Sequence, residues 1–221
     1  MTWYASQIVT SGEPETASLI RDDPLLSRWA YRITNPIVHK WYAAETVHDL
    51  PRNGLIFIRP VCDPSAHIAE WHGGEFLDWN KFSDANGIDL VVDPEIFAAR
   101  QKELEPDLLP PIGLLRKVKE LSYRAKTAFV FYYCFCWGGA VEKEFAWTFG
   151  TRERFLTRQT EEIESESDRY LEISECGVTT QEGSLLVRVL SELGCHLPTG
   201  YFAPHTRSFP WDQHRLRNVG D

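Results

Sequence analysis

The sequence lacks the long apolar segments that mark membrane proteins and secreted precursors. Its longest apolar run, from Ala128 to Trp137, has ten residues, whereas a membrane-spanning helix needs about twenty. Residues 1–16 contain no Lys or Arg, and no apolar stretch typical of a secretory signal follows them. We therefore expect a cytoplasmic protein without a membrane partner.

Phosphate-binding and metal-binding patterns are also missing. The chain has no Gly-x-Gly-x-x-Gly and no Gly-Lys-Ser/Thr motif. Cys134 and Cys136 alternate along a predicted strand, without a second Cys or His pair at the spacing of a zinc site. His67, Glu70 and His72 do not form the helical pattern of zinc proteases. We predict no cofactor and no metal, and the odd number of cysteines, five, indicates reduced thiols.

No familiar catalytic motif surrounds the potential nucleophiles and bases. These are Cys62, Cys195, His196, His205, Ser208 and His214. Glu142 and Glu144 would lie about 6–7 Å apart on one face of a strand, a separation close to that of glycosidase carboxyl pairs. Two such residues more often mark a solvent-exposed face. A non-enzyme is the favoured interpretation, and a hydrolase using Glu142, Glu144 or the histidines is the alternative.

The charge of the chain is negative and unevenly distributed. Asp and Glu number 32 against 23 Lys and Arg, a formal net charge of −9. This balance disfavours nucleic acid, which binds through clustered basic residues. Between residues 161 and 176 only Arg169 opposes seven acidic residues, Glu161, Glu162, Glu164, Glu166, Asp168, Glu172 and Glu175. We predict that these seven form a docking surface for a basic protein partner; a solvated face or loop is the alternative.

The length and composition indicate one folded domain spanning residues 1–221, with a possible internal boundary at 105–111. Apolar residues make up 43% of the chain and charged residues 25%, as in ordinary globular proteins. Residue types and turn signals predict strands near 30–34, 38–43, 55–59, 88–92 and 170–174. The sequence Pro94-Glu95 predicts a helix over about 95–104.

A hairpin over about residues 128–149 is the strongest structural signal. The apolar run at 128–135 is typical of a strand buried on both faces. Residues 141–149 then alternate, with Val141, Phe145 and Trp147 on one face and Glu144 and Ala146 on the other. The pattern predicts one central and one half-exposed strand. We expect an α+β fold with a mixed or antiparallel sheet, this aromatic hairpin at its centre, and a few helices packed on it.

Two helices flank the hairpin in sequence. An apolar stripe predicts the first, formed by Leu114, Leu115, Val118 and Leu121. The second has an apolar face between residues 185 and 193 and a Gly194 C-cap. Thr179 and Glu182 have the spacing of a capping box at its start. The aromatic-rich tail from residue 198 to 221 is expected to pack against the core.

The hairpin carries a family resemblance. Trp137-Gly138-Gly139 followed by Glu142-x-Glu144-x-Ala146-Trp147, within residues 111–150, resembles segments of small bacterial immunity proteins encoded near polymorphic toxins. This resemblance implies a binding protein that blocks a toxin, and the acidic stretch agrees with a basic toxin domain. An enzyme with an unrecognised site and a structural subunit anchored by its tail are the alternatives.

Overall fold

The computed structural model describes most of the chain in detail. The described residues are 3–41, 44–59, 112–137, 140–158, 169–197, 202, 204 and 209–216. The predicted strand at 88–92, the helix at 95–104 and the boundary at 105–111 lie outside them and stay predictions.

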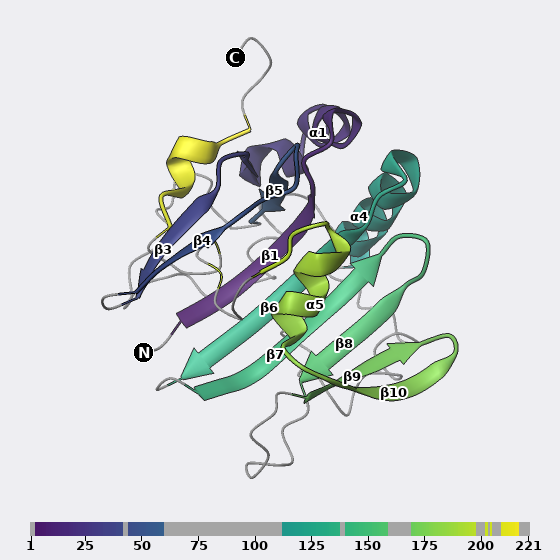
Figure 1. Cartoon of the computed structure of the whole chain (residues 1–221). Helices are drawn as coiled ribbons and strands as arrows, with labels where there is room; N and C mark the ends of the chain where they lie inside the picture. The colour runs from purple at the N-terminus through teal and green to yellow at the C-terminus, as the bar shows by residue number, and fades with distance from the viewer. Residues whose placement is uncertain are drawn as a thin grey trace.

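An eight-stranded sheet organises the fold, with strand order β10-β9-β8-β7-β6-β1-β5-β2 (Figure 1). Every neighbouring pair is antiparallel. The strands are β1 Trp3–Ser11, β2 Ala30–Ile33, β5 Leu55–Ile58, β6 Phe129–Trp137, β7 Ala140–Phe149, β8 Arg154–Arg158, β9 Arg169–Ser174 and β10 Gly177–Glu182. A separate hairpin pairs β3 Ile37–Trp41 with β4 Ala44–His48. The predicted α+β fold is confirmed.

The aromatic hairpin occupies the middle of this sheet as β6 and β7. All side chains from Phe129 to Cys134 are buried, which confirms a strand covered on both faces. The half-exposed β7 was a wrong prediction, because its residues from Glu144 to Phe149 are buried as well. The register shifts between Phe135 and Cys136. As a result Val141 packs on the side of Ala146 and not on that of Phe145.

Helices cover both faces of the sheet. On one face α1 Pro14–Arg21, α4 Ile112–Ala125 and the 3₁₀ turn η1 Leu26–Trp29 bury the apolar side chains that include Phe129, Phe131 and Trp147. On the other face α5 Leu185–Glu192 packs over side chains that include Val130 and Tyr132, and it crosses in front of the sheet in Figure 1. None of the described helices is both long and apolar enough to cross a membrane.

Both predicted helices flanking the hairpin are present, but the second begins differently. Thr179 and Glu182 lie in β10 and do not cap it. Ser184 is the N-cap of α5, and Gly183 with φ +103° separates strand from helix. Gly194, at φ +77°, follows the helix end as predicted. Capping-box spacing involves only four residues, so it also arises within strands.

The N-terminal strand β1 is central although the sequence pattern does not predict it. It lies between β6 and β5 and pairs along its length with β6. Its polar residues Gln7 and Thr10 are fully buried, and the Thr10 hydroxyl donates a hydrogen bond to the Ala128 carbonyl at 2.7 Å. Gly12 connects β1 to α1. A Cβ atom at this position would lie only 2.0 Å from the Asn53 carbonyl oxygen, so a side chain does not fit there.

The C-terminal tail contributes two aromatic side chains to the core. Phe202 and Trp211 are buried, and Trp211, in the 3₁₀ turn η4 Trp211–His214, packs edge-on against Tyr31 at 5.3 Å and Phe57 at 5.5 Å. The Arg59 guanidinium lies 4.2 Å from the centre of the Trp211 ring. The predicted packing of the tail is confirmed for these residues.

We expect Trp211→Ala to lower the free energy of unfolding by about 3–5 kcal/mol, because it removes a buried aromatic side chain and its cation contact. Tyr123→Ala is the matched control, since Tyr123 is 85% exposed and its loss should cost less than about 0.5 kcal/mol. Urea denaturation measures both values. Equal stabilities would contradict a structural role for the tail.

Candidate functional site

The predicted acidic surface falls partly on the described residues. Five of its members lie outside them: Glu161, Glu162, Glu164, Glu166 and Asp168. Glu172 lies on β9, and Glu175 lies in the two-residue turn between β9 and β10. The Glu175 side chain is exposed. The described part of this stretch therefore lies at one end of the large sheet.

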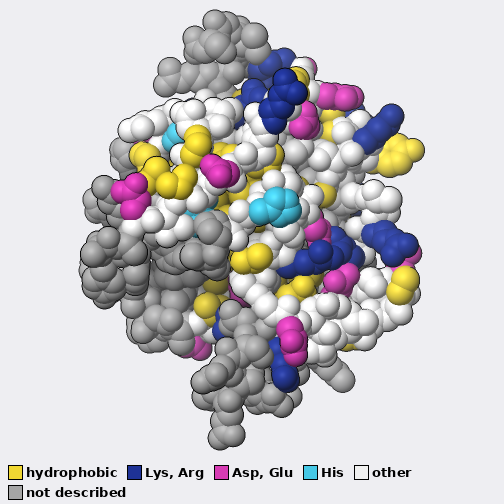
Figure 2. All heavy atoms as spheres, in the orientation of Figure 1, with side chains coloured by type: hydrophobic (Ala, Val, Ile, Leu, Met, Phe, Trp, Pro, Cys, Tyr) yellow, Lys and Arg dark blue, Asp and Glu magenta, His cyan; other side chains and the backbone are white. Residues whose placement is uncertain are grey.

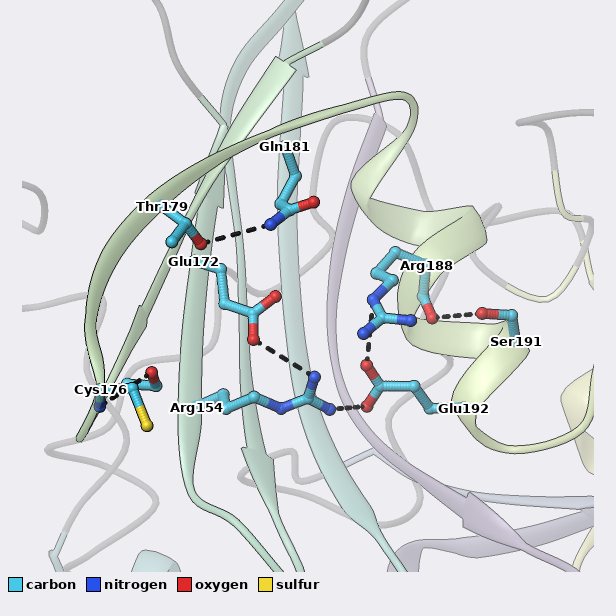
Figure 3. Close-up of polar contacts among 9 residues, drawn as sticks. Arg154, Glu172, Cys176, Thr179, Gln181, Arg188, Ser191 and Glu192 are labelled. Carbon is cyan, nitrogen blue, oxygen red and sulfur yellow. Dashed lines mark hydrogen bonds and ion pairs between the residues drawn. The ribbon is translucent and has the colours of Figure 1, made fainter.

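Glu172 is held by a cation from a neighbouring strand and belongs to a network of two arginines and two glutamates. The Arg154 guanidinium on β8 donates to the Glu172 carboxylate at 3.4 Å and also contacts Glu192 on α5. Arg188 lies 3.3 Å from the second oxygen of Glu192. Figure 3 shows these four side chains bridging β8, β9 and α5. The charge of −6 counted along residues 161–176 is thus partly neutralised in space.

This ion-pair network links α5 to strands β8 and β9 of the sheet. Burial raises the pKa of the neighbouring Tyr170, and the positive charge of Arg188 opposes that rise. Arg154 makes two contacts with carboxylates from different elements, so it fixes their relative position. Glu175 and Glu182, in contrast, expose their side chains to solvent. Among the described residues of β9, β10 and the turn between them, Glu175 and Glu182 are the carboxylates that a partner could contact.

A second polar group lies inside the sheet. Glu144 on β7 is 8% exposed, and it accepts a hydrogen bond of 2.7 Å from the Tyr132 hydroxyl on β6. Arg158 on β8 approaches its other oxygen at 3.7 Å. Burial, followed by the charge of Glu144, raises the pKa of Tyr132 well above its usual value. The phenol therefore stays protonated and donates to the carboxylate.

The carboxyl pair expected on the solvent face of β7 does not occur as predicted. Glu142 is exposed, whereas Glu144 is buried and bonded to Tyr132. The two carboxyl groups thus occupy different environments. The buried contact crosses neighbouring strands, so the alternation of residues along β7 alone does not reveal it.

Glu144 and His214, two residues of the alternative hydrolase site, lie far apart in the fold. His214 stacks on Phe209 at 5.2 Å in η4, and burial lowers its pKa. Because η4 packs on β2, four strand spacings, about 19 Å, separate it from Glu144 on β7. His196 is exposed after α5. The alternative hydrolase site is therefore not assembled from these three residues.

Thiol chemistry and metal binding find little support in the described part of the chain. Burial raises the pKa of Cys195 to about 11, which opposes formation of a nucleophilic thiolate. Cys134 is buried in β6. No group of three or more side chains suited to a metal ion occurs among the described residues. The other candidates, Cys62, His67, Glu70, His72, His205 and Ser208, lie outside them.

Comparisons with known proteins do not assign the chain to a family. No family model matches it, and no curated protein or solved structure shows detectable similarity to it. The resemblance of residues 111–150 to immunity proteins therefore stays a prediction. Function has to be inferred from the geometry and charge of the chain itself.

We expect Arg154→Met to lower the free energy of unfolding by about 1–3 kcal/mol, because it leaves two mostly buried carboxylates without their shared cation. Arg124→Met is the matched control, since the Arg124–Glu120 pair is exposed and such pairs contribute less than about 0.5 kcal/mol. Denaturant titration compares the variants. A cost at Arg154 no larger than at Arg124 would contradict a structural role for the network.

We expect Tyr132→Phe to lower the free energy of unfolding by about 1–3 kcal/mol, because the buried Glu144 carboxylate loses the hydrogen bond from the phenol. Glu144→Leu completes a double-mutant cycle, since it removes the acceptor of the Tyr132 hydroxyl and leaves that hydroxyl buried without its partner. The double variant should cost less than the sum of the single ones. Strict additivity in thermal unfolding would mean that the two groups act independently.

Proposed function

We propose that this chain is a non-catalytic binding protein of immunity type that neutralises a basic toxin domain. Its acidic surface consists of Glu161, Glu162, Glu164, Glu166, Asp168, Glu172 and Glu175. The observation that carries the proposal is the position of Glu175, which is exposed in the tight turn between β9 and β10 at the end of a large sheet. A carboxylate held there is presented to a partner at little entropic cost.

The electrostatics of the chain support a basic partner. Clustered charge of one sign raises association rates and disfavours partners of like charge, and the whole chain carries −9. Glu172 serves a different purpose from Glu175, because it is paired with Arg154 inside the fold. Of the two described members, we therefore assign recognition to Glu175 and support of the surface to Glu172.

The two alternatives are less well supported. A hydrolase would need its acid, base and nucleophile in one place, and Glu144, His196 and His214 do not meet among the described residues. A structural subunit anchored by its tail would need the tail aromatics free, yet Phe202 and Trp211 are buried in the core. Binding through Glu175 uses a carboxylate that the fold leaves exposed to solvent.

The direct test mixes the purified chain with the product of the adjacent gene and measures binding by calorimetry. We expect tight binding that weakens with added salt, and protection of cells that express that product. Replacing Glu161, Glu162, Glu164 and Glu175 by Lys should slow association roughly tenfold or more. The control Glu120→Lys changes an exposed carboxylate on α4 and should have little effect. The absence of both binding and protection would overturn the proposal.

A further inference from the structure

The two edges of the large sheet differ in how they end. At one edge, the C-terminal tail adds a short bridge to β2, pairing Arg215 with Tyr31, and the Leu216 amide donates to the Ala30 carbonyl at 2.8 Å. At the other edge, β10 is the last strand, and the described residues add nothing beyond it. Among the described residues, the sheet is thus closed by its own chain at β2 and open at β10.

The exposed edge of β10 is suited to pairing with another strand. The tight turn makes Ser174 and Gly177 a bonded pair, so the backbone groups of Val178, Thr180 and Glu182 point away from β9. Val178 is 62% exposed. The strand contains neither Lys nor Pro, the residues with which proteins commonly block open edges. No strand of the described residues pairs with this row of backbone donors and acceptors.

We propose that a second copy of this chain occupies the edge, with the two β10 strands antiparallel and a two-fold axis at Thr180. In an antiparallel pair, outward-facing residues bond to each other. This alignment places Thr180 opposite Thr180 of the second copy, and Val178 opposite Glu182. The two large sheets then become one continuous sheet. The proposal does not depend on the proposed function, because it uses backbone groups of β10.

The alignment brings together compatible side chains. No two carboxylates face each other, since Glu182 meets Val178 of the second copy and has Arg169 opposite it on its own β9. Beside the central threonines, Leu171 of each copy lies opposite Thr180 on β9. Thr–Thr pairs such as the central one stabilise neighbouring strands. A two-fold arrangement uses the same strand in both copies and satisfies both open edges at once.

The closed β2 edge limits the assembly to two copies. A sheet with two open edges can add strands at both ends and grow into a filament, whereas the described residues of this sheet leave only β10 open. One short strand per copy gives an interface well below the standard size of about 1,600 Å². We therefore expect a concentration-dependent dimer. Because each copy carries −9, salt should strengthen it by screening their repulsion.

Sedimentation equilibrium of the full chain, over a range of concentrations at low and high salt, tests the proposal. We expect a monomer–dimer equilibrium that shifts toward dimer as salt rises. Thr180→Pro removes an outward amide but no bond to β9, and Thr180→Lys places two cations face to face. Each should weaken the dimer at least tenfold. Thr151→Lys makes the same charge change at an exposed turn and should leave it unchanged.

A cross-link locates the axis. In a Cys176→Ser background, Thr180→Cys should form a disulfide-linked dimer under mild oxidation, because bonded residues across strands lie about 5.5 Å apart, within disulfide reach. Thr151→Cys should not. Circular dichroism checks that each variant folds. If Thr180→Pro does not fold, the effect of Thr180→Lys on dimerisation tests the proposal. A monomer under all conditions, or a dimer indifferent to Thr180→Lys, would overturn the proposal. A toxin-dependent strand pairing at β10 without self-association would overturn it too.

Discussion

Burial of the β6–β7 hairpin on both faces is the constraint on which the other elements depend. Apolar side chains point from it alternately to the two sides, with Phe129, Phe131 and Trp147 toward α1 and α4, and Val130 and Tyr132 toward α5. A strand buried in this way needs a complete layer on each side of the sheet. The helices from the start and middle of the chain supply one layer. α5 and the aromatic tail supply the other, which is why Trp211 belongs to the core.

Because the sheet is buried on both faces, polar groups inside it need hydrogen-bond partners within the protein. A carboxylate or hydroxyl deprived of water must find a partner in the protein. Glu144 finds Tyr132 and Arg158, and Thr10 finds the backbone of Ala128. These bonds run between neighbouring strands, so they favour one register of β7 on β6 and of β1 beside β6. Their value lies in fixing register as much as in stability.

Much of the fold was accessible from the sequence, and the failures share a physical origin. The hairpin, both flanking helices and several strands follow from local periodicity and turn signals, as in the apolar stripe of α4. β1 was missed because Gln7 and Thr10 break its apolar pattern, although both are buried. Glu144 was assigned to solvent because a polar residue with a buried partner resembles a hydrated one in sequence. Local patterns record residue type, whereas burial depends on strands distant in the chain.

The composition of the acidic surface could not be predicted fully from the sequence, for a related reason. Charge counted along residues 161–176 omits Arg154 and Arg188, which the fold brings beside Glu172 and Glu192. The surface is consequently divided between carboxylates that hold the structure and carboxylates that face solvent. The local sequence does not distinguish carboxylates paired within the fold from carboxylates exposed to solvent.

The β9–β10 end of the sheet contributes few side chains to the core. Tyr170 is buried there, yet the side chains of β10 are almost all exposed or only half-buried. Residues in such a strand are free to serve contacts outside the chain. The two interactions inferred for this end use different groups, carboxylate side chains for a basic partner and backbone amides for a second copy. Glu175 lies in the turn beyond the paired strand, so a partner attracted by its charge does not require the backbone edge of β10.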